Sequence, residues 1–225
     1  MNIGIISALE EEISLLREYF VFEATYKCGS VTVTETSMFS NRVFLAIGGV
    51  GKTSAAVATH VLISEMNCEV VLNTGLAGGC ENNLRPGDAV LASASVYHDF
   101  HPAGFGAIYE KQVFRSSVML NTTAIEVMAS QGLGYISGVV ATGDIFVSNK
   151  QLMQQIVTDT NCVCVDMELA AIAHICFLNN IPYLSLKIIS DSADESAADD
   201  FQFSLSVYAQ YCSSFIYSLV KQLSL

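Results

Sequence analysis

The feature that most constrains the fold of this sequence is a regular alternation of short apolar runs with segments of helical periodicity. The apolar runs are rich in Val and Ile, and they recur from the first residues to the last third of the chain. Such alternation is typical of α/β proteins, in which helices cover a sheet that is buried on both faces. We therefore expect an α/β fold: a three-layer α-β-α sandwich around a twisted, mixed and largely parallel sheet.

The expected elements follow from the period of the apolar residues. The predicted strands are 3–7, 31–36, 43–47, 70–73, 89–94, 135–141, 162–165 and 183–189. The predicted helices are 10–20, 53–65, 121–130, 149–157, 168–178 and an amphipathic C-terminal helix within 201–220. The last of these carries no charge, but its serines and glutamines favour a helix packed on the core over a membrane span.

The organisation expected from composition is a single domain, residues 1–225. Hydrophobic residues make up 52% of the chain and charged residues 14%, so most of it must enter a core. No linker-like or low-complexity stretch interrupts the pattern. A chain of this size can bury one core well and is short for two.

Charge and cysteine content exclude several classes of function. The formal net charge is −12, and the few basic residues do not cluster, which argues against nucleic-acid and membrane partners. The start of the chain lacks a secretion signal, and the odd number of cysteines, seven, indicates reduced thiols and a cytoplasmic protein. His98, Asp99 and His101 have no further ligand nearby in sequence, so we expect no metal.

One stretch, AIGGVGKT at 46–53, raises the possibility of an NTPase. Gly51, Lys52 and Thr53 fit a relaxed phosphate-loop pattern, in which backbone amides and the lysine bind nucleotide phosphates. The pattern is permissive, because Ala46 stands where glycine is usual and at least two strands precede it. The other reading is a strand–turn–helix junction that needs glycine for its backbone geometry.

Carboxylates follow several of the predicted strands. Glu12 follows the first strand, Asp166 and Glu168 follow the strand at 162–165, and Asp191 follows the strand at 183–189. Ligands of α/β folds collect beyond the carboxyl ends of strands, so these side chains are candidates for one site. Helix capping explains each of them about as well when it is taken singly.

In their order and spacing, several segments together resemble one family. The segments are GIISALEEE, GGVGK, NTGLAGG, GD before YHD, TGDIFV, VDMELAAIAH and IISDSAD. They resemble the 5′-methylthioadenosine/S-adenosylhomocysteine nucleosidases of the purine nucleoside phosphorylase and uridine phosphorylase superfamily. The resemblance covers essentially the whole chain. It implies a phosphorylase/hydrolase-like fold, a homodimer, no cofactor, and a GGVGK turn at the nucleoside cleft in place of a triphosphate site.

The resemblance also implies catalytic roles for four residues. Asp191, oriented by Ser190, would protonate the adenine. Glu12 would take the proton of the attacking water, and Glu168 would hold the ribose hydroxyls. The remaining residues implied to bind substrate are Val50, Leu76, Ala77, Gly78, Phe146, Val147, Asp166, Met167, Lys187 and, from the partner subunit of a homodimer, Phe105.

Three positions depart from the family pattern. Leu76 replaces a small residue, typically serine, whose hydroxyl helps to place the water. Lys187 stands where arginine is usual, and Asp166 replaces a glutamate. The scarcity of arginine and the carboxylate of Glu12 favour water over phosphate as the nucleophile, because a phosphate dianion beside an unpaired carboxylate is unfavourable.

The departures keep two further readings open. One is a related hydrolase, such as one acting on futalosine or 5′-deoxyadenosine, which would share the acid and the base. The other is a non-catalytic nucleoside-binding protein.

Overall fold

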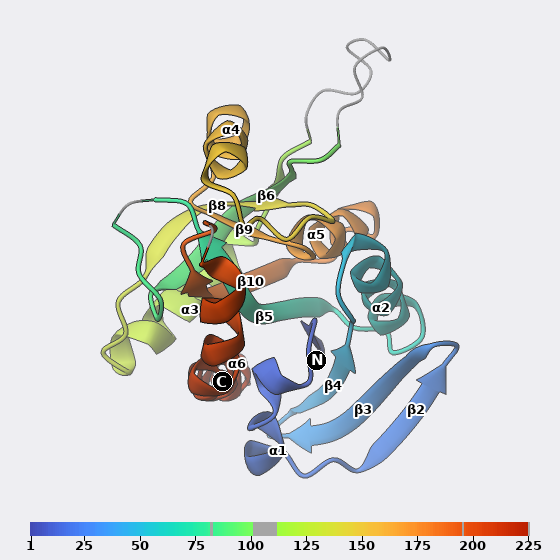
Figure 1. Ribbon diagram of the computed structural model, residues 1–225. Helices are drawn as coiled ribbons and strands as arrows, with labels where there is room; N and C mark the ends of the chain where they lie inside the picture. Colours follow the sequence, from blue (N-terminus) through green and yellow to red (C-terminus); the bar gives the residue numbers. More distant parts are fainter. Residues whose placement is uncertain (82, 101–111, 195, 225) are drawn as a thin grey trace.

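The computed structural model describes residues 1–81, 83–100, 112–194 and 196–224 (Figure 1). Its strands are β1 (Asn2–Ser7), β2 (Ala24–Cys28), β3 (Val31–Met38), β4 (Asn41–Ile47), β5 (Val70–Gly79), β6 (Ala89–Tyr97), β7 (Phe114–Arg115), β8 (Ile136–Thr142), β9 (Cys164–Asp166) and β10 (Tyr183–Asp191). Its helices are the 3₁₀-helix η1 (Glu11–Ile13) and the α-helices α1 (Leu16–Tyr19), α2 (Lys52–Ser64), α3 (Val118–Ser130), α4 (Lys150–Thr160), α5 (Leu169–Leu178) and α6 (Ala197–Gln222).

The strands form one mixed sheet, which confirms the α/β class. The order along the sheet is β10-β6-β8-β9-β5-β1-β4-β3-β2, with β7 on β6. Within the described ranges, β5 is parallel to β1 and β10, whereas β9 on β5 and β6 on β10 are antiparallel. Parallel and antiparallel pairings are about equally common, so the expectation of a largely parallel sheet is not met.

The sheet also closes on itself, because β10 pairs with β5 as well as with β6. Strand β5 makes this possible by changing neighbours along its length. On one edge, β5 pairs with β1 through Val70–Asn73 and with β9 through Gly78 and Gly79. On its other edge, β5 pairs with β10. The ring β5-β9-β8-β6-β10 therefore brings the ends of β9 and β10 beside the ends of β1 and β4.

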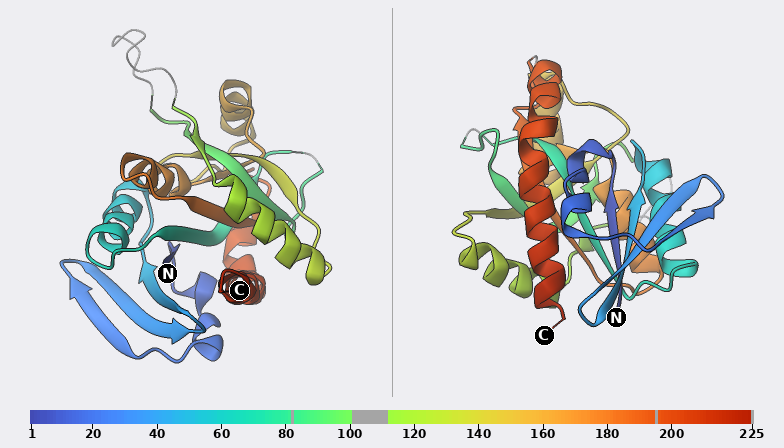
Figure 2. Two further views of the ribbon diagram at one scale, coloured as in Figure 1. Left: turned by 180° about the vertical axis from the view of Figure 1, so that it is seen from behind. Right: turned by 90° about the horizontal axis from the view of Figure 1, so that it is seen from below.

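Helices cover both faces of the sheet, each over its own apolar core (Figures 1 and 2). Helices α2 and α5 pack against each other and enclose one core with residues such as Leu62, Phe44 and Ile172. Helix α6, with η1, α1 and α3, encloses the second core, which contains Phe215 and Leu72. The long α6 helix crosses the molecule beside η1 and α3, as the second view of Figure 2 shows.

Several predicted boundaries differ from the structure. The segment 10–20 is a 3₁₀ turn followed by a four-residue helix, with a break around Ser14 and Leu15. The glycine-rich segment after the strand at 70–73 is itself strand, because its backbone groups pair with β10 and β9. Strand β2 was missed, since its side chains are mostly exposed and give little apolar signal.

The C-terminal helix is longer than predicted and starts four residues earlier, at Ala197. It buries Cys212, Phe215 and Leu219 against the sheet. Within the part of the chain that the structure describes, no helix combines the length and the apolar character needed to cross a bilayer.

The packing of α6 generates a stability prediction. Phe215 is fully buried, so Phe215→Ala should lower the free energy of unfolding by about 3–5 kcal/mol through lost transfer energy and a cavity. Val207→Ala on the same helix is the matched control, because Val207 is exposed and its loss should change stability by less than about 0.5 kcal/mol. Urea unfolding of both variants measures the difference, and equal midpoints would contradict the assigned packing.

Candidate active site

A single pocket lies where the ends of β5, β9 and β10 meet the segments that follow β1, β4 and β8. Its empty space, including the open mouth, is about 560 Å³. The pocket is lined by Ala8, Leu9, Glu12, Val50, Leu76, Ala77, Gly78, Ile145, Phe146, Val147, Val165, Asp166, Met167, Glu168, Ser190, Asp191 and Phe201.

The structure brings together nearly all the residues that the sequence marked as site candidates. The exceptions are Lys187, which does not line the pocket, and Phe105, which lies outside the described residues. Glu12, Glu168 and Asp191 come from segments far apart in the chain, and all three line this one pocket and are buried. Three acidic groups therefore converge on one apolar cavity.

Glu12 is held by four hydrogen bonds. Its Oε2 atom accepts from Ser7 Oγ at 2.5 Å and from the amides of Ala8 and Leu9, both at 3.1 Å. Its Oε1 atom accepts from the amide of Leu76 at 2.9 Å. The two oxygens thus differ, since three donors surround Oε2 and one donor reaches Oε1.

Gly75 is needed for this arrangement. A Cβ atom at position 75 would lie 2.8 Å from Glu12 Oε1, which is closer than real Cβ atoms approach an oxygen. The absence of a side chain lets the carboxylate lie against β5 and reach the next amide, that of Leu76. Leu76 therefore contributes its backbone amide to the site, while its side chain is buried in the apolar core that α6 covers.

Asp191 and Ser190 form a second acidic group of the pocket. Ser190 Oγ lies 2.5 Å from Asp191 Oδ2 and 3.2 Å from the carbonyl oxygen of Ala77, and the amide of Ala193 donates to Asp191 Oδ1 at 2.9 Å. Burial raises the pKa of Asp191, and this effect outweighs the two hydrogen bonds, which lower it. The protonated form is therefore more accessible near neutral pH than for an ordinary aspartate.

Glu168 is held from outside its own segment. Its Oε1 atom accepts a hydrogen bond of 2.8 Å from the amide of Gly51, in the turn before α2. Burial, and then the neighbouring charge of Asp166, raise the pKa of Glu168 to about 7, although Lys187 and the Gly51 amide oppose them. Among the described residues no hydrogen bond to Oε2 is found, so this oxygen is free to bind a ligand.

Asp166 lines the pocket, but its carboxylate is engaged within the protein. Oδ1 accepts from Thr142 Oγ1 at 2.5 Å, and Oδ2 accepts from the amide of Leu169 at 2.9 Å and from Lys187 Nζ at 2.8 Å. Asp166 thus caps α5 and pairs with a buried cation. Burial lowers the pKa of Lys187, but the charges of Asp166, Glu168 and Glu12 more than compensate, so this pKa is raised and the lysine stays charged.

The turn that resembles a phosphate loop binds carboxylates of the protein itself. The Gly51 amide donates to Glu168, and the Lys52 amide donates to Asp144 Oδ1 at 2.8 Å. The Lys52 side chain pairs with Asp99 Oδ2 at 2.5 Å. The groups that a phosphate loop would offer to a nucleotide are therefore occupied, which argues against the NTPase reading.

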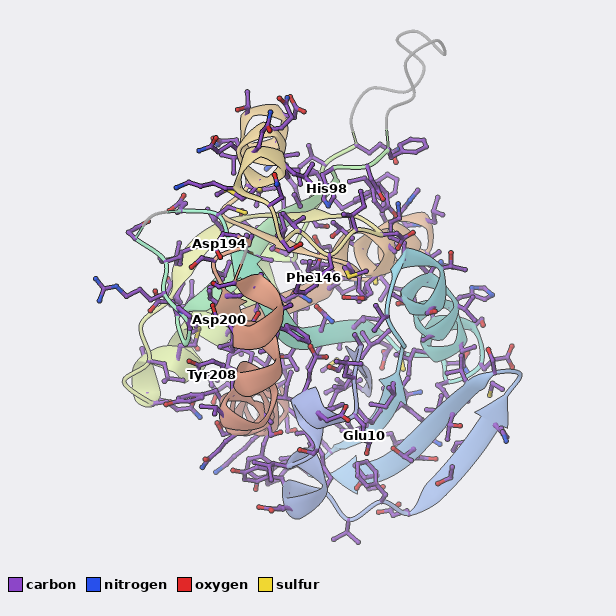
Figure 3. The ribbon with its side chains drawn as sticks, viewed as in Figure 1. Glu10, His98, Phe146, Asp194, Asp200 and Tyr208 are labelled. Atoms are coloured by element: carbon purple, nitrogen blue, oxygen red, sulfur yellow. The ribbon has the colours of Figure 1, made fainter. Side chains whose placement is uncertain are left out.

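Five residues of the pocket were not predicted. Ala8 and Leu9 precede Glu12 in the same turn, and Ile145 and Val165 adjoin predicted residues. Phe201 lies on the first turns of α6, and its ring meets that of Phe146 edge-on, with centroids 5.8 Å apart. Phe146 is labelled in Figure 3. No local pattern marks Phe201 as a site residue, because its helical spacing fits a core position equally well.

His98, Asp99 and His101 were weighed as metal ligands in the sequence and not favoured. Among the residues described, no group of three His, Cys, Asp or Glu side chains is arranged to hold a metal ion. Asp99 binds Lys52, and His101 lies outside the described residues.

Comparison with known proteins identifies the family. The family described as the phosphorylase superfamily matches residues 2–221, and the chain belongs to it. A 5′-methylthioadenosine/S-adenosylhomocysteine nucleosidase from Actinobacillus succinogenes is 32% identical over 231 residues, which cover 99% of this chain and 100% of the relative. A nucleosidase of the same name from Haemophilus influenzae is 31% identical with the same coverage. The chain is therefore an N-glycosidic bond hydrolase that acts on nucleosides.

Solved structures agree in fold and point to two related activities. The 5′-methylthioadenosine/S-adenosylhomocysteine nucleosidase from Neisseria meningitidis, in complex with methylthio-immucillin-A, superposes with a TM-score of 0.93 at 32% identity, covering 98% of both chains. The native futalosine hydrolase of Helicobacter pylori superposes with a TM-score of 0.94 at 29% identity, covering 98% of this chain and 97% of that one.

The buried ion pair generates a prediction about stability. Lys187→Met should lower the free energy of unfolding by about 3–5 kcal/mol, because it leaves the carboxylate of Asp166 buried without its cation. Lys187→Arg keeps the charge and should cost clearly less. In the double variant Lys187→Met/Asp166→Asn much of the loss should return. Urea unfolding of the wild type, Lys187→Met, Lys187→Arg, Asp166→Asn and the double variant tests this. Strict additivity of the two single changes would contradict the pairing.

The raised pKa of Glu168 predicts a dependence of stability on pH. In the unfolded chain Glu168 releases its proton near pH 4.3, whereas the folded protein retains it up to about pH 7. The folded state then binds more protons, so its stability relative to the unfolded state falls as pH rises between these values. Glu168→Gln lacks this effect.

The measurement for Glu168 is the difference in free energy of unfolding between wild type and Glu168→Gln across this pH range. The advantage of the wild type should shrink by roughly 2–4 kcal/mol from pH 4.5 to 7.5. Asp191 is present in both proteins, so its contribution cancels. A constant difference would show that Glu168 titrates normally.

Proposed function

We propose that the protein hydrolyses the N-glycosidic bond of 5′-methylthioadenosine and S-adenosylhomocysteine, releasing adenine and the corresponding thio-substituted ribose. The observation that carries the proposal is the convergence of Glu12, Glu168 and Asp191 in one pocket with apolar walls. The names of the relatives support the choice of substrates. In the reaction the bond from C1′ to the base breaks, a bond from C1′ to a water oxygen forms, and the base leaves with an added proton.

Asp191 is the proposed general acid for the departing adenine. Its raised pKa favours the protonated state that an acid needs, and its environment is less polar than that of a surface aspartate. Ser190 can serve both protonation states. Its hydroxyl donates to the ionised Asp191, and it can instead donate to the carbonyl of Ala77 while it accepts from the protonated carboxyl. Ser190 thereby orients the acid throughout proton transfer.

Glu12 is the proposed base that takes a proton from water. Oε1 is the better candidate atom, because it has one donor where Oε2 has three. The amide of Leu76 fixes this oxygen without a side-chain hydroxyl, so the loss of the family's serine leaves the base positioned by backbone. A positioned general base contributes typically about 10²–10⁴ in rate.

Glu168 is the proposed partner of the ribose. With Oε1 held by Gly51, its Oε2 can accept hydrogen bonds from ribose hydroxyls. Positive charge develops on the sugar as the bond breaks, and a buried carboxylate beside it stabilises that charge strongly. Met167 precedes Glu168 in the pocket wall and is placed to pack against the sugar.

The apolar wall of the pocket suits a purine. Phe146 is 42% exposed and Val50 is 53% exposed, and both line the pocket, so a nucleoside bound there would cover their apolar surface. Phe146 is proposed to stack on adenine, with Val147 at its edge and Ala77 and Gly78 at the base and ribose. Val50 would lie near the sugar and the 5′ substituent.

Water is the proposed nucleophile in preference to phosphate. Neither lysine nor arginine lines the described part of the pocket, and Lys187 is already paired behind Asp166. A phosphate dianion at the anomeric carbon would face Glu12 without a counter-charge, at a cost of several kcal/mol at an effective dielectric constant of about 20.

A homodimer is proposed to complete the site. Phe105 would reach from one subunit and close the 5′ pocket of its partner, as the family resemblance implies. Sedimentation of the purified protein should give twice the mass of one chain.

A second candidate function is the hydrolysis of futalosine, which is favoured by the likeness to the futalosine hydrolase structure. Such an enzyme would share the acid, the base and the ribose-binding carboxylate and would differ at the 5′ end. The test is base release from a panel of methylthioadenosine, S-adenosylhomocysteine, 5′-deoxyadenosine and futalosine, followed by chromatography. Fastest release from futalosine would favour the second function, ribose-1-phosphate would indicate a phosphorylase, and tight binding without release would indicate a non-catalytic protein.

Asp191→Asn tests the assignment of the acid. The amide preserves size and can still accept from Ser190, but it carries no acidic proton. We expect turnover to fall by about 10²–10⁴, with nucleoside affinity changed less than tenfold. Turnover by adenine release and affinity by calorimetry measure the two effects. Asp194→Asn is the control, because Asp194 lies on the same loop but not in the pocket wall. Equal turnover in Asp191→Asn and wild type would exclude the role.

A further inference from the structure

Three sequence motifs that the proposed chemistry leaves unexplained meet at the start of α2. Lys52 Nζ lies 2.5 Å from Asp99 Oδ2, after the end of β6, and 3.6 Å from Asp144 Oδ2, after the end of β8. The two acidic residues are linked as well, because the amide of Asp144 donates to Asp99 Oδ2 at 2.8 Å. Figure 3 shows His98, the neighbour of Asp99, on this side of the molecule near the end of β6.

This cluster of Lys52, Asp99 and Asp144 borders the turn that holds Glu168. Asp144 Oδ1 accepts from the amide of Lys52 at 2.8 Å, and the adjacent amide, that of Gly51, donates to Glu168 Oε1 at 2.8 Å. Gly51 has φ of 91°, and a Cβ atom there would lie 3.1 Å from Asp144 Oδ1. The carboxylate of Asp144 therefore presses against the turn whose amide points into the pocket.

We propose that Lys52 is a positioning residue, which acts through Asp144 and Asp99 to fix the turn at Gly51 and thereby the orientation of Glu168. Lys52 does not line the described part of the pocket. Its role is to fix the positions of three loops relative to one another, namely those that follow β4, β6 and β8. The functional consequence rests on the proposed role of Glu168, but the positioning itself does not.

The burial of the Lys52–Asp99 pair makes this role effective, while the side chain of Asp144 is 50% exposed. The side chain of Lys52 is 23% exposed and that of Asp99 is 16% exposed, so solvent screens this pair less than a surface pair. Lys52 Nζ also lies 5.5 Å from the centre of the Tyr97 ring, a favourable position for a cation. Burial raises the pKa of Asp99, but the contacts with Lys52 and the Asp144 amide outweigh it, and the pKa is lowered overall. Asp99 is therefore ionised at neutral pH.

The pKa of Glu168 depends on the position of the turn at Gly51. The groups that face Glu168 are the charges of Asp166, Lys187 and Glu12 and the amide of Gly51. The three charged groups lie on β9, on β10 and at η1, and none of them contacts Lys52. The Gly51 amide is the part of this environment that the cluster controls. When the turn loosens, the ionised form of Glu168 loses a hydrogen bond, and its pKa rises.

The experiment is a ¹³C NMR titration of the glutamate carboxyl groups in the ligand-free protein, with the Glu168 signal assigned through Glu168→Gln. The wild-type midpoint is expected near pH 7. In Lys52→Met the midpoint should move to higher pH by about 0.5 to 1, part of the effect of one charge-assisted hydrogen bond. Lys52→Arg should restore the wild-type midpoint, because arginine can bind both acidic partners.

Asp144→Ala separates positioning from a direct effect of charge. This variant removes a negative charge, so a direct effect would lower the pKa of Glu168, whereas loss of positioning raises it. Lys27→Met, on the exposed strand β2, is the matched control for the loss of one lysine and should leave the midpoint unchanged. An unchanged midpoint in folded Lys52→Met, or a lower midpoint in Asp144→Ala, would overturn the inference.

Adenine release gives a second readout. Lys52→Met should lower kcat/KM by about tenfold, with its acid limb moved to higher pH in step with the Glu168 titration. Lys52→Arg should retain most of the activity. The titration needs no substrate, so a wild-type protein that releases no adenine would contradict the proposed function alone, while an unmoved titration would contradict the positioning role alone.

Discussion

The burial of several carboxylates around one buried ammonium group is the constraint on which the rest of the structure depends. Glu12, Asp166, Glu168 and Asp191 are each less than a tenth exposed, and Lys187 is 2% exposed. Desolvated charges are costly unless other groups compensate them. Here the compensation is local, through backbone amides, serine and threonine hydroxyls, and the lysine. Each carboxylate therefore has a defined orientation, and burial raises the pKa values of Glu168 and Asp191, which favours the protonated form that acid–base chemistry on a nucleoside uses.

The fold creates this environment through the path that strand β5 takes in the sheet. β5 changes neighbours along its length, so the sheet closes into a ring and the ends of β9 and β10 face the ends of β1 and β4. At Gly75 the strand has no side chain, and the carboxylate of Glu12 takes that space. At Gly51 a left-handed turn directs an amide to Glu168. The absence of a side chain at Gly75 and at Gly51 thus leaves space for carboxylates of the same protein.

The resemblance of the sequence to a family predicts most of the residues that line the pocket, and the strand ends alone indicate the acidic candidates. Neither signal predicts the positions of two further side chains, those of Lys187 and Phe201. Lys187 was expected to bind substrate, but it lies behind the pocket wall and pairs with Asp166. Phe201 packs against the core under the last helix, as its helical spacing predicts, but it also lines the pocket. Both depend on the direction in which a side chain leaves its element, which periodicity does not specify.

The sequence by itself determined the α/β class, the order of most elements and the residues at the strand ends, because apolar periodicity and glycine placement act locally along the chain. The tertiary structure alone decided that the sheet is evenly mixed and closed, and which amide meets which carboxylate. It also decided which groups Lys52 contacts, since the sequence motif of Lys52 fits a nucleotide-binding site equally well. The physical reason is that charge compensation is a property of groups brought together in space, and Lys52, Asp99 and Asp144 are distant in sequence but in contact in the fold.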